Sequence, residues 1–369
     1  MTGRERILAA LERKQPDTVP VWELAFNEAS IRKIARNFVD EKRLPPEKLF
    51  FDMDDMELLQ LVDALVTIGR ELDLDGANTF FGGPMKRIDA SRVRNADGVV
   101  FQCTEHGEPY PVAGPVSRMS DLKNFKMRPP KDEDFIQTTI ARSQFRDKAV
   151  SYMLSGPFYL SWCLRGSMEA LLTDYALNPD LARALARIAT DWDLETVEKV
   201  AKKGADFCVF ECDLAFVTNT LMSRAMYEDF IGPYHKEIVA RVHELGMKAV
   251  KHSDGVLTPF IPCFIEEGFD GLHPIQPQCM NIGEIKKKFG GPDGKLCIMG
   301  NIDCSELLPF GTPEQVRETV RETIAAAAPG GGYIISSSNT IHPDCKPENY
   351  SALVKAAREF GKYPELTSK

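Results

Sequence analysis

The sequence lacks paired cysteines and long apolar runs. It contains nine cysteines, but no two have CxxC spacing, and an odd, scattered number is typical of reduced thiols in a cytoplasm. No stretch approaches the roughly 20 apolar residues that a membrane-spanning helix requires. The first residues predict an amphipathic helix and contain no apolar signal core. We therefore expect a cytoplasmic protein without a membrane partner.

The chain also lacks an excess of basic residues. It has 45 lysines and arginines against 54 aspartates and glutamates, so its net charge is −9. Nucleic acids and anionic lipids are bound by basic surfaces, so this balance argues against both as general partners. Hydrophobic residues make up 43% of the 369 positions, which is enough for a large core without a disulfide or metal staple. These features are typical of a soluble enzyme.

No linker or low-complexity segment divides the chain, and we expect a single domain over 1–369. A Pro- and Lys-rich patch at 126–131 separates the N-terminal additions and first units in 1–130 from a regular region over 149–361. In that region short apolar segments alternate with helical ones. The predicted strands are 149–154, 207–210, 248–251, 271–272, 296–299 and 333–335. The predicted helices are approximately 180–202, 223–245, 258–267, 282–288, 312–328 and 347–361.

This alternation predicts a parallel α/β sheet. Six units are visible, and the N-terminal third can supply two more strands, which makes a TIM (β/α)8 barrel with N-terminal helical and hairpin additions. Those additions include a helix capped by Thr2, a helix over 53–72 and a strand over 99–103 followed by a turn at His106 and Gly107. A doubly wound sheet is the competing fold, but no GxGxxG or Walker A motif follows the first strand.

Polar residues follow the predicted strands, and in a barrel the C-terminal strand ends converge on one mouth. Glu211, Asp213, His252 and Asp254 form the sharpest combination. Imidazole and carboxylate ligands suit Zn²⁺ or another divalent cation, which could polarise a substrate oxygen at an open position. The alternative is that His252 and Asp254 cap the following helix and only form hydrogen bonds at the mouth.

Other polar residues at strand ends are candidates for binding substrate. They are His273, Gln276, Asn301, Asp303 and Asn339. Four aromatic residues of the N-terminal third could line a pocket, although aromatic residues near strands more often belong to the core. They are Trp22, Phe26, Phe80 and Phe81.

Segments spread over nearly the whole chain resemble the uroporphyrinogen decarboxylase superfamily. They are 2–6, 17–21, 234–246, 252–255, 300–303 and 331–334. The resemblance implies a TIM barrel. Decarboxylases of this superfamily carry Arg-Gln-Ala-Gly-Arg just after the first Pro-Val-Trp, and those arginines hold the substrate carboxylates. Here Glu23 and Glu28 follow that tripeptide and no arginine lies between it and Arg32, so charge-assisted bonds of about 1.5–3 kcal/mol each would be missing.

The other branch of the superfamily comprises cobamide-dependent methyltransferases. In these, zinc activates a thiol or polarises a methyl ether, and the methyl group moves to or from the cobalt of a separate corrinoid protein. Thiol-using members have His-x-Cys where this chain has His252-Ser253-Asp254, and a later Cys where it has Ser338-Asn339. Oxygen ligands leave a metal harder and more Lewis acidic than thiolates do, which implies an oxygen-bound methyl donor.

The resemblance thus implies an O-demethylase that takes a methyl group from a methoxylated aromatic to cob(I)alamin, giving methylcobalamin on the corrinoid partner. Zinc would be held by His252 with Glu211 and Asp213 or Asp254, and Asp254 could instead protonate the departing oxygen. His252, Asp254 and Glu211 are therefore the expected catalytic residues. Asn301, Asp303 and Asn339 would orient the substrate.

Three alternatives stay open at this point. A metal-free decarboxylase would act on another acid, and a methyltransferase could use a thiol or amine donor. A non-catalytic barrel would bind a small molecule without turnover. A homodimer is compatible with each of them.

Overall fold

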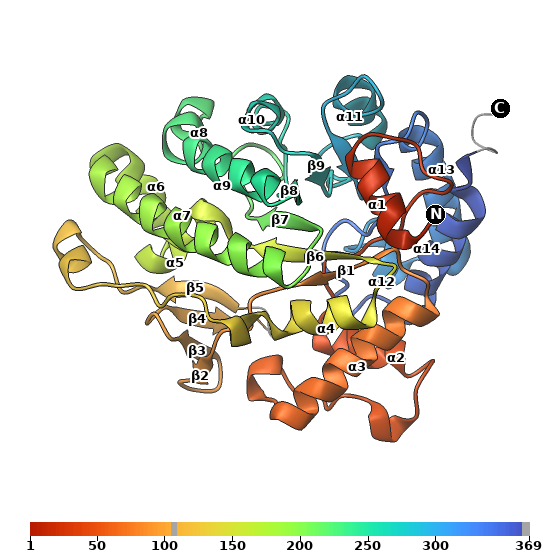
Figure 1. Ribbon diagram of the computed structural model, residues 1–369, viewed down its shortest axis with the longest axis horizontal. Helices are drawn as coiled ribbons and strands as arrows, with labels where there is room; N and C mark the ends of the chain where they lie inside the picture. Colours follow the sequence, from red (N-terminus) through yellow and green to blue (C-terminus); the bar gives the residue numbers. More distant parts are fainter. Residues whose placement is uncertain (105–108, 364–369) are drawn as a thin grey trace.

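A curled parallel sheet forms the centre of the computed structural model, which describes residues 1–104 and 109–363 (Figure 1). The predicted turn at His106 and Gly107 lies outside these residues. The seven strands run in the order β1, β6, β7, β8, β9, β10, β11, and every neighbouring pair is parallel. Their bounds are Gly76–Thr79, Ala149–Leu154, Phe207–Glu211, Lys248–His252, Gly271–His273, Cys297–Met299 and Tyr333–Ile334.

An extended N-terminal segment occupies the eighth position of the barrel. The backbone N–H of Trp22 donates to the carbonyl of Ile335 at 3.1 Å, and Ile335 donates to Pro20 at 3.0 Å. On the other side, Asp75 donates to the carbonyl of Val21 at 2.8 Å. This segment therefore joins β11 to β1 and closes the sheet. The TIM barrel predicted from the sequence is confirmed, including the two strands expected from the N-terminal third.

Helix α1 (Gly3–Leu11) covers the end of the barrel at which the strands begin. Thr2 forms a capping box with Glu5, as the predicted helix start requires. Ile7 and Leu11 are fully buried and belong to a cluster with side chains from the barrel interior, among them Phe207. The amphipathic N-terminal helix thus supplies the floor of the barrel core.

The remaining helices of the barrel surround the sheet (Figure 1). Their bounds are α4 Ile136–Gln144, α5 Gly156–Arg165, α6 Met168–Leu177, α7 Pro179–Lys202, α8 Arg224–Phe230, α9 Gly232–Glu244, α10 Ile261–Glu267, α11 Ile282–Phe289, α12 Leu307–Phe310, α13 Pro313–Ala327 and α14 Pro347–Phe360. The single helix predicted over 223–245 is wrong, because the chain leaves helical geometry at Ile231 and Pro233 lies in the first turn of α9. None of the helices in the described residues is both long and apolar enough to cross a membrane.

The N-terminal additions form a second layer beside the barrel (Figure 1). They contain α2 (Glu28–Ala35), α3 (Asp55–Glu71) and an antiparallel sheet. The sheet consists of β2 Met85–Arg87, β3 Arg92–Asn95, β4 Val100–Cys103 and β5 Pro109–Ala113. The strand predicted at 99–103 is therefore β4. These additions matter for function because they wall a cavity against the barrel.

Candidate active site

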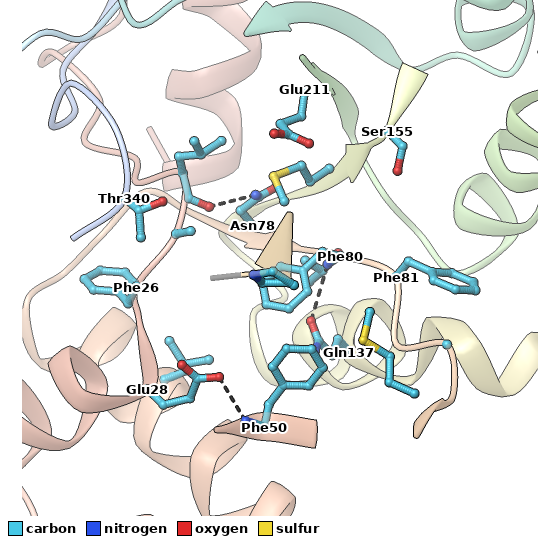
Figure 2. Close-up of a pocket in the computed structure, with 18 of the residues that line it drawn as sticks. Phe26, Glu28, Phe50, Asn78, Phe80, Phe81, Gln137, Ser155, Glu211 and Thr340 are labelled. Carbon is cyan, nitrogen blue, oxygen red and sulfur yellow. Dashed lines mark hydrogen bonds between the residues drawn. The ribbon is translucent and has the colours of Figure 1, made fainter. Parts of the chain in front are cut away.

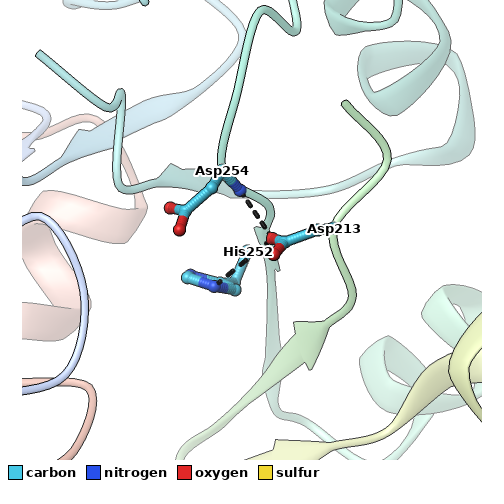
Figure 3. A group of neighbouring side chains, drawn as sticks. All are labelled: Asp213, His252 and Asp254. Atoms are coloured by element: carbon cyan, nitrogen blue, oxygen red, sulfur yellow. Dashed lines mark hydrogen bonds and ion pairs between the residues drawn. The ribbon is translucent and has the colours of Figure 1, made fainter. Parts of the chain in front are cut away.

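Asp213, His252 and Asp254 meet at the C-terminal ends of β7 and β8 (Figure 3). Each residue offers one potential ligand atom, and these three atoms lie within 4.8 Å of one another. Among the described residues, no other group of three or more His, Cys, Asp or Glu side chains meets this condition. His252 Nε2 lies 4.0 Å from Asp213 Oδ1, which also accepts the backbone N–H of Asp254 at 2.8 Å. We call these three residues the donor group.

A hydrogen-bond chain fixes which nitrogen of His252 carries the proton. Ser336 Oγ donates its one proton to the carbonyl of Ser337 at 2.8 Å, so it accepts from His273 Nε2 at 3.1 Å. His273 Nδ1 then accepts from His252 Nδ1 at 2.8 Å. His252 Nε2 is left with its lone pair free beside the carboxylates, which is the form that binds a metal ion.

Burial keeps both histidines neutral. It lowers the pKa of His252 to about 3, and the nearby Lys251 ammonium lowers it further. Burial also lowers the pKa of His273 well below its ordinary value. Neither imidazole has to lose a proton before a cation binds near neutral pH.

Asp254 brings an unsatisfied buried oxygen to the donor group. Its Oδ2 accepts a hydrogen bond from Asn339 Nδ2 at 2.5 Å, whereas its Oδ1 is buried and has no hydrogen-bond partner. Burial, followed by the charge of Asp213, raises the pKa of Asp254 to about 7. A divalent cation would satisfy the orphaned oxygen and offset the repulsion between the carboxylates. Two oxygens and one imidazole nitrogen fit zinc with a position left for substrate.

Glu211, which the sequence also suggests as a ligand, does not belong to the donor group. It ends β7, pairs with His252 across the sheet and lines a neighbouring cavity (Figure 2). Burial, and secondarily the charge of Asp213, raises the pKa of Glu211 to about 7. Its carboxyl group therefore belongs to the cavity lining and is near enough to Asp213 to respond to its charge.

The cavity has a volume of about 450 Å³ and extends from the barrel mouth to α3 and the antiparallel sheet. Phe26, Phe50, Phe80 and Phe81 give it aromatic walls, and Glu211 lies at the opposite side from Phe50 (Figure 2). We call it the aromatic cavity. Pockets of this size and lining bind small organic molecules.

The amide side chains in the wall hold the aromatic cavity in shape. Asn78 Nδ2 donates to the carbonyl of Leu24 at 2.7 Å, and Gln137 Oε1 accepts the backbone N–H of Phe80 at 3.3 Å (Figure 2). Both side chains lie between segments of the N-terminal third and the barrel. They fix the orientation of the walls against which a ligand would pack.

Glu23 connects the aromatic cavity to the donor group. Ser337 Oγ lies 2.6 Å from Glu23 Oε1 and 2.5 Å from the carbonyl of Asn339, although it has only one proton to give. Both contacts are satisfied when the Glu23 carboxyl is protonated and donates to Ser337, which donates to Asn339. Burial likewise raises the pKa of Glu23 to about 8. A protonated Glu23 therefore supports the residue that holds Asp254.

The other residues selected from the sequence fall into two sets. Phe26, Phe80 and Phe81 line the aromatic cavity. Trp22 does not, because it is fully buried and its Nε1 donates to Ser151 Oγ at 3.1 Å.

Three of the polar candidates hold loops of the barrel mouth and lie outside the cavity lining. Gln276 accepts the backbone N–H of Gly255 at 2.8 Å, and Asn301 Nδ2 donates to the carbonyl of Ile275 at 2.7 Å. Asp303 accepts the backbone N–H of Ser305 at 2.8 Å. Asn339 and His273, by contrast, contact the donor group directly.

The sequence patterns did not identify three of the residues that line the aromatic cavity, namely Phe50, Asn78 and Gln137. Asn78 belongs to β1, which was not recognised as a strand, and a polar residue inside a barrel strand would have indicated the site. Phe50 and Gln137 lie in short helical segments whose patterns carry no comparable signal.

Comparisons with known proteins agree with this architecture. The family model for uroporphyrinogen decarboxylase (URO-D) matches residues 2–360. A uroporphyrinogen decarboxylase from Coxiella burnetii is 23% identical over 96% of this chain and 95% of that enzyme. A methylated-thiol–coenzyme M methyltransferase from Methanosarcina mazei is 25% identical over 56% of this chain and 52% of that enzyme.

A solved structure of a methyltransferase from Methanosarcina mazei has the same fold. It superposes with a TM-score of 0.71 at 18% sequence identity and covers 98% of this chain and 99% of its own. The match of the family model over almost the entire sequence decides the assignment. The chain belongs to the uroporphyrinogen decarboxylase family.

Proposed function

We propose that this protein is a zinc-dependent methyltransferase that moves a methyl group from an O-methyl donor, a methoxylated aromatic, to the cobalt of a corrinoid partner protein. The observation that carries the proposal is the donor group of two carboxylates and one neutral imidazole beside an aromatic cavity. The similarity to the methylated-thiol–coenzyme M methyltransferase supports the methyltransferase class. The oxygen donors of this chain favour an ether over a thiol.

Each part of the site has one task in this proposal. Zinc, when bound by Asp213, His252 and Asp254, supplies a Lewis acid for the ether oxygen. The aromatic walls hold the ring of the donor, and the methyl group leaves without the bonding electrons, which stay on the oxygen. This oxygen then takes up a proton. We assign the role of proton donor to the carboxyl of Glu211, since Glu211 lines the cavity next to His252.

A decarboxylase is the second candidate, because relatives with that name match along the full chain. Such an enzyme must hold a polycarboxylate, and Arg32 is not available for this task. Its guanidinium donates to the carbonyl of Pro45 at 2.6 Å and pairs with Glu41. Glu23 and Glu28, which follow the Pro-Val-Trp segment, line the cavity instead.

The deciding experiment is the metal content of the purified protein and its His252→Ala variant. We expect about one zinc per chain in the wild type and none in the variant. The variant should also lose methyl transfer from methoxyarenes to cob(I)alamin. His243→Ala is the matched control, because His243 pairs with Asp270 away from the donor group. Turnover that survives His252→Ala, or no zinc in either protein after zinc is supplied, would reject the proposal and favour the decarboxylase.

A further inference from the structure

The charged residues around the aromatic cavity are nearly all acidic. In the lining formed by the described residues they are Glu23, Glu28, Asp97, Glu211 and Arg128. Arg128 is the one basic residue among them. A ligand whose carboxylate lies away from the donor group would therefore depend on this single guanidinium for charge compensation.

Arg128 is already paired with a protein carboxylate, which compensates its charge. Its Nη1 donates to Asp134 Oδ2 at 2.8 Å and its Nη2 to Asp134 Oδ1 at 2.9 Å. Asp134 is only 2% exposed, so it cannot turn to solvent and release the guanidinium. A bidentate pair of this kind is among the stronger polar contacts in proteins, so an entering carboxylate would meet a guanidinium whose positive charge is already balanced.

The acidic residues cannot compensate the negative charge of a ligand carboxylate, whether they are protonated or ionised. Glu23 bonds to Ser337, Asp97 accepts the backbone N–H of Arg128 at 2.6 Å, and Glu28 accepts that of Phe50 at 3.0 Å. Each side chain is either neutral or negative. A ligand carboxylate buried among them would lose its hydration without gaining a counter-charge, which is costly.

The size and the walls of the cavity indicate an aromatic ligand. A protein cavity of about 150 Å³ holds benzene, and this cavity measures about 450 Å³. It has room for a substituted ring or for two rings. A compact methylated ammonium ion would leave most of that volume unfilled, even though aromatic residues and carboxylates attract cations.

We infer that the methyl donor is an aryl methyl ether without a carboxylate, and that this cavity selects against methoxyarenes carrying one. The inference rests on the proposed function and adds the charge class of the substrate. Specificity arises here from the pairing of Arg128 with Asp134, because an anionic competitor finds no cation in the wall whose charge is uncompensated.

Three probes of nearly equal shape test the charge selection: 3-methoxybenzamide, 3-methoxybenzoate and 3-methoxybenzylamine. Binding to the full-length protein at pH 7 is measured by calorimetry and by the fluorescence of Trp192, which lines the cavity. We expect the amide and the benzylamine each to bind at least tenfold more tightly than the benzoate. Equal or tighter binding of the benzoate, or no binding of the amide, would overturn the inference.

A substitution in the wall provides the converse test. Gln137→Lys adds a cation to the lining, and we expect it to improve binding of 3-methoxybenzoate at least tenfold. Gln137→Leu is the control, because it alters the same wall without charge and should retain the preference for the amide. A lysine variant that binds the amide but still rejects the benzoate would contradict an electrostatic origin of the selection.

The two proposals can fail separately in these measurements. If the amide binds selectively and no methyl group reaches cob(I)alamin, the charge selection stands and the methyltransferase proposal fails. If 3-methoxybenzoate is demethylated as efficiently as the amide, the methyltransferase proposal stands and the inference about charge fails.

Discussion

At the scale of single residues, the hydrogen-bond chain behind His252 decides how the donor group binds a cation. His273→Phe removes the acceptor for His252 Nδ1, so the imidazole loses the bond that fixes its proton and its orientation. We expect zinc affinity to fall about 10- to 100-fold, the usual effect of losing such a partner. The measurement is a competition titration with a chelator, with circular dichroism to verify folding.

Ser336→Ala provides a graded comparison for this prediction. It removes only the group that accepts from His273 Nε2, one bond further from the donor group. Its effect on zinc affinity should be smaller than that of His273→Phe. Unchanged affinity in both variants would show that the chain of bonds does not orient His252.

Glu23 makes stability depend on pH. Its pKa is raised from 4.5 to about 8, chiefly by burial, so between these values the folded protein binds a proton that the unfolded chain has lost. Stability attributable to Glu23 therefore falls as pH rises from about 4.5 to about 8, by up to about 1.4 kcal/mol per pH unit.

Glu23→Gln isolates this contribution, because the amide group imitates a protonated carboxyl and can donate to Ser337. We expect the variant to gain stability relative to the wild type as pH rises from 5 to 8 in urea denaturation. Asp254 titrates in both proteins and cancels in the difference. A constant difference across this range would mean that Glu23 is ionised in the folded state.

The composition of the donor group could be predicted from the sequence, and its surroundings only in part. Asp213, His252 and Asp254 follow strands whose ends must meet in a parallel barrel. The same reasoning cannot separate Glu211 from them, because Glu211 is two positions before Asp213 and in register with His252, and residues two apart along a strand point to the same face. The bond from His273 to His252 depends on ring orientations that spacing does not encode.

At the scale of secondary-structure elements, α1 is the part of the N-terminal region on which the barrel most depends. Ile7 is fully buried in the interior cluster. Ile7→Ala should lower the free energy of unfolding by about 2–5 kcal/mol, through lost burial and the cavity left behind. Ile7→Val removes a single methylene and should cost about 0.5–1.5 kcal/mol.

Urea denaturation of the two variants checks this prediction. Equal stability of both variants and the wild type would show that α1 packs only loosely against the strand beginnings. A helix on the surface of the barrel would behave in this way, because substitutions of surface residues usually change the free energy of unfolding by less than about 0.5 kcal/mol.

The regular elements were easier to predict than the additions. Strands such as β6 and β7 are short apolar runs bounded by polar residues, and their limits agree with the sequence pattern. Helix α5 was missed because most of its residues are buried and it lacks a clear polar face. Helix α6 was missed because its apolar residues do not gather on one face, although it is only partly buried. The break between α8 and α9 depends on Pro233, whose effect on the helix was not considered in the pattern of apolar residues.

At the scale of the whole molecule, zinc binding should stabilise the fold. A ligand that binds only the folded state contributes about 2.7 kcal/mol at a concentration 100 times its dissociation constant. We expect the Tm to rise with added zinc until the site is saturated and to fall when a chelator is added. Differential scanning calorimetry measures both changes.

His252→Ala should abolish the increase in Tm that zinc produces. In the presence of a chelator, the Tm of the variant should stay near that of the wild type. The comparison separates loss of metal from loss of folding. A variant whose Tm still rises with zinc would locate the bound metal elsewhere on the protein.

The closure of the barrel by the segment before β1 has a consequence for biosynthesis. Glu23 and its partner Ser337 are 314 positions apart, and Trp22 likewise pairs with Ile335 at the far end of the chain. During translation the first extended segment must wait, with one edge unpaired, until almost all of the protein has left the ribosome. Such distant pairings make folding slow and expose unpaired edges to aggregation. We therefore expect this edge of the protein to be open to aggregation until the segment around Ile335 pairs with it.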